Sequence, residues 1–202
     1  MITIVDYNLG NLFSVQNLLN RSKIAYKISK NPKEIENADA LLLPGVGSFN
    51  IAMQNLKKLN LDVAIKKAAK KQTPILGICL GMQLLFESSS EGGFSKGLNL
   101  IPGEVIEFDD QTSKIPHMGW NSLIKNIDDF LFDSVDLNLD YYFVHSYYVK
   151  TDSKYILSNT KYEHNIFPSI VKKNNIIGMQ FHPEKSDIAG FKLIENFKEY
   201  IK

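Results

Sequence analysis

The strongest chemical signal in the sequence surrounds its single cysteine, Cys79. Glycines flank it in Gly77-Ile78-Cys79-Leu80-Gly81, between an apolar segment and an amphipathic one. This spacing is typical of a nucleophile elbow, in which a strand turns into a helix and holds the nucleophile in a strained backbone conformation. Bulky residues at the glycine positions would collide, and the start of the helix would stabilise a thiolate. The alternative is that Cys79 is a small buried hydrophobe, as free cysteines usually are.

A histidine that could act as a base lies in Gln180-Phe181-His182-Pro183-Glu184, at the end of an expected strand. In an extended chain, residues two apart face the same side, so the Glu184 carboxylate can reach the His182 imidazole. Glu184 would then set the tautomer of His182 and stabilise its charged form. The alternative is a surface His–Glu pair at a strand end. A metal site made of Cys79, His182 and Glu184 is less favoured, because no second cysteine or histidine pair completes it.

A glycine-containing turn, Pro44-Gly45-Val46-Gly47-Ser48, follows another apolar segment. It is not a phosphate-binding Walker loop, since no Gly-Lys-Ser/Thr follows. Two glycines allow backbone N–H groups to approach a ligand closely. The turn could therefore supply half of an oxyanion hole, with the N–H of Leu80 as the other half. An ordinary turn between a strand and a helix explains the same residues.

The first half of the chain alternates short apolar runs with amphipathic stretches. This alternation predicts a parallel sheet covered on both faces by helices. The expected strands are Ile2–Asp6, Ala25–Ser29, Ala40–Leu43 and Pro74–Ile78. The expected helices are Asn8–Asn20, a short one from Pro32, Phe49–Leu56, Asp62–Lys71 and Leu80–Glu87.

The second half is rich in β-branched and aromatic residues and favours strands joined by short turns. We expect a final helix over Asp187–Ile201, and Ser88–Gly93 is the best candidate for a mobile loop. The predicted fold class is therefore α/β, a mostly parallel sheet with antiparallel strands added in the C-terminal half of one domain, residues 1–202. The expected strands are Gly103–Phe108, Asn121–Ile124, Tyr141–Val149, Tyr155–Thr160, Ile166–Lys172 and Ile176–Phe181.

The composition is that of an ordinary globular domain. The 202 residues are 44% hydrophobic and 22% charged, with a formal net charge of +1. Near-neutral charge argues against duplex nucleic acid as the main ligand. No apolar stretch approaches the roughly 20 residues that span a bilayer, and the N-terminus lacks a secretory pattern. We therefore expect no nucleic-acid or membrane partner and, with one unpaired cysteine, a cytoplasmic location.

Taken together, these motifs resemble those of class I (triad) glutamine amidotransferases over essentially the whole chain. The chain is most similar to the HisH-type glutaminase subunits of imidazole glycerol phosphate synthase. The evidence for the subfamily is Asp6-Tyr7-Asn8-Leu9-Gly10-Asn11-Leu12, Pro116-His117-Met118-Gly119-Trp120-Asn121 and Tyr142-Phe143-Val144-His145-Ser146-Tyr147. The first segment departs slightly, with Asn8 where a glycine is common, which touches no catalytic position.

The resemblance implies a flavodoxin-like fold and a glutaminase that needs no cofactor. Cys79 would attack the side-chain amide of glutamine, with His182 and Glu184 completing the catalytic triad. His145 would belong to a binding strand rather than serve as a second base. The residues expected to hold glutamine are Gly45, Val46, Gly47, Leu80, Gln83, Ser146 and Tyr147.

The resemblance also implies a partner subunit. Ammonia is mostly protonated near neutral pH and is then no nucleophile, so its acceptor site must be adjacent. The expected partner is a (β/α)₈-barrel cyclase that forms imidazole glycerol phosphate and an aminoimidazole carboxamide ribotide. The expected interface residues of this heterodimer are Asn8, Asn11, His117, Met118, Trp120 and Asn121. The alternative for Trp120 is a core aromatic.

Two other functions remain open at this point. The same glutaminase chemistry could feed a different acceptor, such as a sugar-amidating synthase. A cysteine-elbow stress or redox protein of similar fold would lack glutaminase activity, although Gln83 and the His182–Glu184 pair speak against it. A pure binding module would not need the triad.

Overall fold

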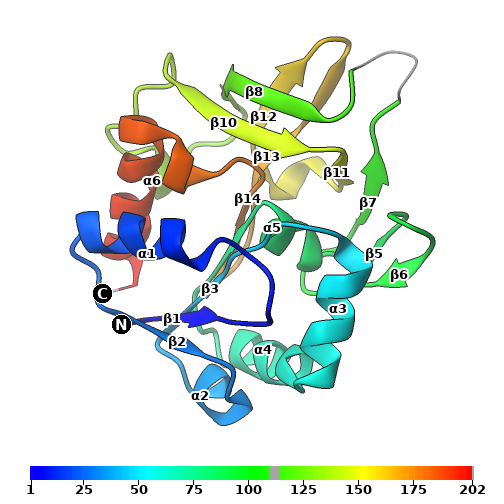
Figure 1. Cartoon of the computed structure of the whole chain (residues 1–202). Helices are drawn as coiled ribbons and strands as arrows, with labels where there is room; N and C mark the ends of the chain where they lie inside the picture. Colours follow the sequence, from blue (N-terminus) through cyan, green and yellow to red (C-terminus); the bar gives the residue numbers. More distant parts are fainter. Residues whose placement is uncertain (110–113, 202) are drawn as a thin grey trace.

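The computed structural model describes residues 1–109 and 114–201 and is built around one eight-stranded sheet (Figure 1). The strand order is β2-β1-β3-β4-β14-β13-β12-β9. The first five strands run parallel, and the remaining three are antiparallel to their neighbours. The mixed α/β architecture expected from the sequence is confirmed. The strands are β1 (Ile2–Val5), β2 (Tyr26–Ser29), β3 (Ala40–Leu43), β4 (Ile75–Ile78), β9 (Ile124–Lys125), β12 (Ile156–Tyr162), β13 (Asn165–Lys173) and β14 (Ile176–Met179).

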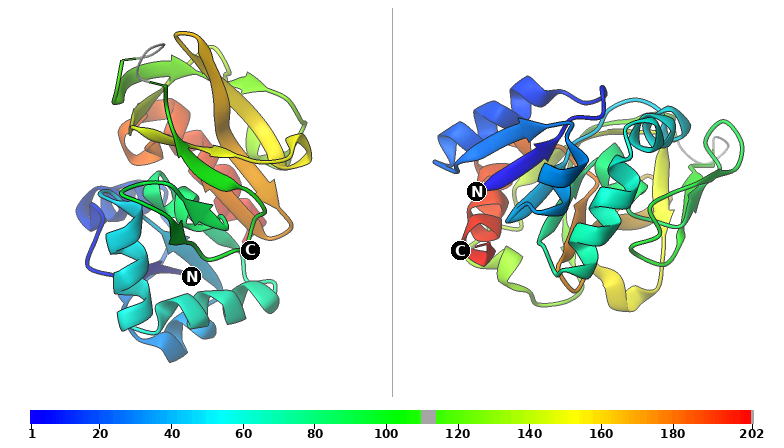
Figure 2. Two further views of the ribbon diagram at one scale, coloured as in Figure 1. Left: turned by 90° about the vertical axis from the view of Figure 1, so that its right-hand side faces the viewer. Right: turned by 90° about the horizontal axis from the view of Figure 1, so that it is seen from below.

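Helices cover both faces of this sheet, as Figures 1 and 2 show. One apolar core lies under α1 and α6, and a second lies under α2, α3, α4 and α5. In the part of the chain described, no helix is both long and apolar enough to cross a membrane. The helices are α1 (Leu12–Arg21), α2 (Pro32–Glu36), α3 (Phe49–Lys58), α4 (Leu61–Lys70), α5 (Leu80–Leu84) and α6 (Asp187–Tyr200), with single 3₁₀ turns at Phe130–Phe132, Ser153–Tyr155 and Pro183–Lys185.

Two of the helices are shorter than the sequence pattern suggests. Helix α1 begins at Leu12 rather than Asn8, because Asn8 has a φ of 65° and the Asn11 side chain caps the helix by accepting from the Ser14 N–H. Helix α5 ends at Leu84 instead of Glu87. The segment between β1 and α1 is therefore a loop, and it passes beside the turn that follows β3.

Two smaller sheets are formed by strands between residues 88 and 150. Strands β8 (His117–Ser122) and β10 (Asp140–His145) form one; β11 (Tyr147–Lys150), β7 (Glu104–Glu107), β5 (Ser88–Ser89) and β6 (Ser95–Lys96) form the other.

These sheets correct three expectations. The strand expected over Tyr141–Val149 is two strands that part at Ser146 and join different sheets. Strand β8 begins at His117 rather than Asn121, and Ile124 belongs to the separate strand β9. The start of the expected Ser88–Gly93 loop is paired as strand β5.

The functional segments meet at one edge of the large sheet. Strands β3, β4 and β14 are adjacent and parallel, so their carboxyl ends lie side by side. The Gly45–Gly47 turn follows β3, Cys79 follows β4 and His182 follows β14. The carboxyl edge of a parallel sheet is the usual position of a ligand site in open α/β folds.

Candidate active site

Cys79 occupies a strained backbone position between β4 and α5. Its φ is 53° and its ψ is −111°, a conformation that is costly for a residue with a side chain. Close packing of the chain holds it there: a Cβ on Gly77 would lie 2.6 Å from the Gly81 carbonyl oxygen, and one on Gly81 would lie 1.8 Å from that of Leu43. The strained turn from strand to helix that the two glycines predict is therefore present, and the role of Cys79 as a nucleophile stays a prediction.

The His182–Glu184 pair is buried beside the elbow. The Nδ1–H of His182 donates to Oε1 of Glu184 at 2.7 Å, and the two side chains are only 2% and 3% exposed. The surface-pair alternative is therefore wrong. The His182 Nε2 atom has no hydrogen-bond partner among the described residues. With Nδ1 committed to Glu184, Nε2 is the atom available to a thiol or a leaving group.

The charge of His182 is set by its neighbours. Burial by itself disfavours the charged imidazole, but a thiolate at Cys79 and the Glu184 carboxylate outweigh burial and raise the pKa of His182 to about 10. The imidazole is thus protonated at neutral pH when it faces a thiolate. In a thiolate–imidazolium pair the thiolate can attack a substrate and the imidazolium can donate a proton to the leaving group.

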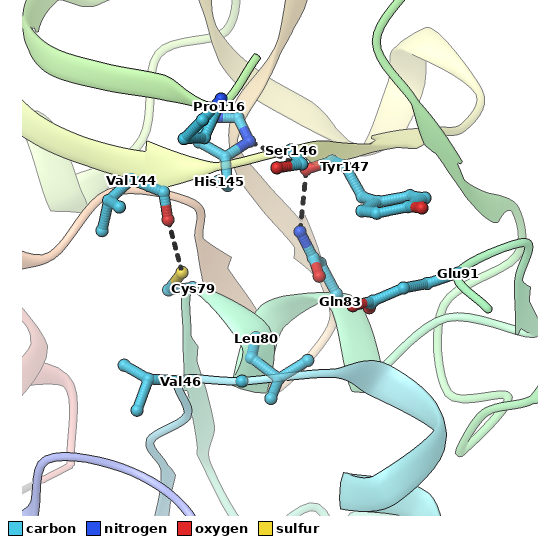
Figure 3. A pocket seen from close by; sticks show the side chains of 11 residues that line it. Val46, Cys79, Leu80, Gln83, Glu91, Pro116, Val144, His145, Ser146 and Tyr147 are labelled. Atoms are coloured by element: carbon cyan, nitrogen blue, oxygen red, sulfur yellow. Dashed lines mark hydrogen bonds between the residues drawn. The ribbon is translucent and has the colours of Figure 1, made fainter.

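A cavity of about 370 Å³ opens above Cys79 (Figure 3). It gathers residues from the β3 turn, the elbow, the β5–β6 turn and the β10–β11 junction. Gly45 lies behind the lining, packed against Tyr7 and Leu80. The lining residues are Val46, Gly47, Cys79, Leu80, Gln83, Glu91, Pro116, Val144, His145, Ser146 and Tyr147.

Gln83 ties the elbow helix to the far wall of the cavity. Its Nε2 donates to the Tyr147 carbonyl at 2.9 Å and to Oε1 of Gln180 at 3.1 Å. The Gln180 amide in turn approaches the Cys79 sulfur at 3.8 Å. A chain of hydrogen bonds therefore connects the β11 backbone, through Gln83 and Gln180, to the Cys79 sulfur.

Comparison with protein-family models matches residues 3–199 to the glutamine amidotransferase class-I family. The chain belongs to the class-I glutamine amidotransferase family. It is 47% identical over 199 residues to the imidazole glycerol phosphate synthase subunit HisH 1 of Campylobacter jejuni, covering 98% of each chain. It is 49% identical over 200 residues to the subunit HisH 2 of Methanococcus maripaludis, also covering 98% of each.

Solved structures agree on the fold. A crystal structure of a glutamine amidotransferase matches with a TM-score of 0.72 at 14% identity, covering 100% of this chain and 97% of the other. The PurLQS structure from Thermotoga maritima matches with a TM-score of 0.73 at 18% identity, covering 100% and 98%. The amidotransferase fold is thus shared with chains whose sequences have diverged widely.

Glu91 is a pocket residue of this amidotransferase that sequence reasoning missed. Its Oε2 accepts the N–H of Phe49 at 2.8 Å, at the start of α3, and Figure 3 shows the side chain beside Gln83. Burial raises the pKa of the Glu91 carboxyl. Glu91 lies in the segment expected to be a mobile loop, where no pattern marks a ligand-binding carboxylate.

His145 is held as a neutral group in the amidotransferase pocket. Its Nδ1–H donates to the Tyr147 carbonyl at 2.8 Å, and its Nε2 lies 3.0 Å from Nδ1 of His117. Burial lowers the pKa of both histidines, that of His145 to about 3. A neutral ring bonded on both sides is not poised to act as a second base, which agrees with the binding-strand interpretation.

The residues expected at a partner surface separate into two groups. His117 is fully buried between the rings of Phe143 and Tyr162, so its side chain is not part of the exposed surface of this segment. Met118 and Trp120 are 61% and 48% exposed, which also excludes Trp120 as a core aromatic. Successive residues of a strand point to opposite faces, so β8 buries one side chain and presents the next. Asn8 and Asn11 are exposed, and Asn121 is partly buried.

We expect Cys79→Ala to lower the pKa of His182 well below about 10, because the substitution removes the thiolate and leaves burial in place. NMR titration of the assigned His182 ring protons measures the change directly. Ser146→Ala, which alters the pocket lining without removing a charge, is the control and is expected to leave the titration near its wild-type position. An unchanged His182 titration in Cys79→Ala would show that the two groups are not coupled.

Proposed function

We propose that this chain is the glutaminase subunit of an imidazole glycerol phosphate synthase and supplies ammonia for a step of histidine biosynthesis. The observation that carries the proposal is the buried His182–Glu184 pair beside a strained Cys79 at the base of a pocket. The subfamily is supported by relatives named HisH that are 44–49% identical over nearly the whole chain.

The first half of the reaction forms a covalent intermediate. The Cys79 thiolate attacks the side-chain carbonyl carbon of glutamine, and the carbonyl oxygen becomes an oxyanion. The backbone N–H of Leu80 and an N–H of the Gly45–Gly47 turn stabilise that charge. The Nε2 proton of His182 passes to the amide nitrogen, the carbon–nitrogen bond breaks, and ammonia leaves behind a γ-glutamyl thioester.

The second half regenerates the enzyme. His182, now neutral, takes a proton from water, and the resulting nucleophile attacks the thioester carbonyl. The carbon–sulfur bond breaks, the thiolate is restored and glutamate is released. Glutamine and water have then become glutamate and ammonia, with Glu184 keeping the imidazole in one tautomer throughout.

The pocket also carries groups suited to the rest of the substrate. Glutamine is a zwitterion, so its α-ammonium needs an acceptor. We assign that role to the Glu91 carboxylate, which lines the cavity near Gln83. Backbone groups around Ser146 and Tyr147, with Gln83 behind them, form the opposite wall. Of these groups, Glu91, Ser146 and Tyr147 lie on elements other than the elbow, and Gln83 lies on the elbow helix itself.

The need for a partner subunit follows from what happens to the released ammonia. Released into water near neutral pH, ammonia is protonated and lost to synthesis, so the acceptor site must cover the glutaminase site. We propose a (β/α)₈-barrel cyclase as that partner in a cytoplasmic heterodimer. Exposed Met118 and Trp120 on β8 provide apolar anchors of the kind that dominate interface energy. Asn8, Asn11 and Asn121 would complete the contact.

We expect Cys79→Ala to abolish glutamine hydrolysis in the complex with the cyclase subunit, because no other side chain can form the thioester. Glutamate release is measured by an enzymatic assay, and product analysis of the complete reaction identifies the ammonia acceptor. The variant should still bind the cyclase and melt near the wild-type temperature. Undiminished hydrolysis by Cys79→Ala would contradict the mechanism, and the absence of imidazole glycerol phosphate among the wild-type products would contradict the assigned pathway.

We expect Trp120→Ala to weaken complex formation by about tenfold or more, in line with the loss of a buried aromatic anchor. Isothermal titration calorimetry with the cyclase subunit measures the affinity. Val63→Ala is the matched control, because Val63 is also half-exposed but lies on α4, away from β8 (Figure 1). Unchanged affinity in Trp120→Ala, or a large drop in the melting temperature of the free subunit, would remove Trp120 from the interface.

A further inference from the structure

Tyr7 is a buried polar residue that the mechanism above does not use. It lies two residues after the end of β1, and its side chain is completely inaccessible to solvent. Its hydroxyl donates a hydrogen bond to the carbonyl oxygen of Pro44, the residue that opens the Gly45–Gly47 turn. A buried tyrosine hydroxyl usually finds such a partner. The partner here belongs to the turn that the mechanism needs as half of the oxyanion hole.

The hydrogen bond between Tyr7 and Pro44 lies in a tightly packed region around Gly45. A Cβ built on Gly45 would lie 2.5 Å from the Tyr7 hydroxyl oxygen, 2.9 Å from Cβ of Leu80 and 3.0 Å from the backbone nitrogen of Gly81. The phenol, the turn and the elbow are therefore in direct contact at one point. Because the peptide group is planar, fixing the Pro44 carbonyl also fixes the direction of the Gly45 N–H and the start of the turn.

The hydroxyl remains a donor under all working conditions. Burial, followed by the charge of Cys79, raises the pKa of Tyr7 far above its usual value. The phenol thus stays neutral and protonated, and it lies close enough to the nucleophile to sense its charge. No bound ligand is needed to keep this contact in place.

We propose that Tyr7 is a positioning residue for the oxyanion hole. Its hydroxyl holds the Pro44 carbonyl and so keeps the N–H groups of the Gly45–Gly47 turn aligned with the N–H of Leu80. This inference rests on the proposed glutaminase function. Tyr7 does not reach the substrate; it acts through the turn.

Tyr7→Phe removes one oxygen atom and tests the proposal with little change in shape. Leaving the Pro44 carbonyl unpaired removes only part of the stability of a domain of this size, so the protein is expected to remain folded. The turn is then free to rotate toward a new partner. Because loss of one oxyanion donor typically lowers kcat by about 10²–10³-fold, we expect misalignment to lower kcat by at least about tenfold. KM should change less than about twofold, since Gln83, Glu91 and Tyr147 lie on other elements.

Tyr141→Phe is the matched control. Tyr141 is equally buried, but its hydroxyl has no hydrogen-bond partner among the described residues. Removing that hydroxyl should leave kcat, KM and stability near wild type or slightly improve stability. A comparison of the two variants separates the loss of this particular hydrogen bond from the loss of any buried hydroxyl.

The experiment measures kcat and KM for glutamine hydrolysis by the complex with the cyclase subunit, together with the rate at which iodoacetamide alkylates Cys79. Alkylation needs the thiolate but forms no oxyanion, so a positioning role predicts an unchanged alkylation rate in Tyr7→Phe beside a lowered kcat.

Wild-type kcat in Tyr7→Phe would overturn the proposal. So would a parallel fall of kcat and alkylation, which would indicate damage to the elbow, or an equal fall of kcat in Tyr141→Phe. A wild-type complex that hydrolyses no glutamine would instead contradict the proposed function, and the Tyr7 proposal with it.

Discussion

The backbone of Cys79 is held at a φ of 53° by close contacts around Gly77 and Gly81, where there is no space for a side chain. The rest of the site depends on this arrangement. Gly77 and Gly81 let the elbow press against itself and against the end of β3. The Cys79 N–H also bonds the Met179 carbonyl at 2.7 Å, which anchors the elbow to β14. The packing and hydrogen bonds of the parallel strands thereby offset the backbone strain at Cys79, which is about 1–3 kcal/mol.

Once the elbow is fixed, adjacent strands bring the other groups to it. Strand β14 delivers His182, and β3 delivers the Gly45–Gly47 turn, since both strands flank β4. The His182–Glu184 pair is removed from water, so its interaction with the nucleophile is strong enough to overcome the burial that disfavours an imidazolium. Tyr7, from β1 on the other side of β3, closes the arrangement by bonding the Pro44 carbonyl. Each of four neighbouring parallel strands is thus followed by one group of the site.

The parts that the sequence predicts are those encoded within a few neighbouring residues. The Gly77–Gly81 spacing and the His182–Glu184 pair follow from short-range geometry, and alternating apolar runs predict the parallel half of the sheet. The break at Ser146 could not be foreseen, because β10 and β11 are both rich in aromatic and β-branched residues and only their partners differ. Glu91 and Tyr7 were missed for the same reason: their partners, Phe49 and Pro44, are 42 and 37 residues away in the chain. The burial of His117 could not be foreseen, because the side of β8 that faces the core depends on its pairing with β10, which lies more than 20 residues further along the chain.

The central claim is that the strained Cys79 becomes the covalent carrier of the γ-glutamyl group. The most direct measurement is acid quenching of the complex during glutamine turnover, followed by peptide mass spectrometry. The account predicts a γ-glutamyl adduct on the peptide that contains Cys79, with none in the Cys79→Ala variant. Full-rate hydrolysis of glutamine with no adduct on Cys79, or with an adduct on another residue, would contradict it.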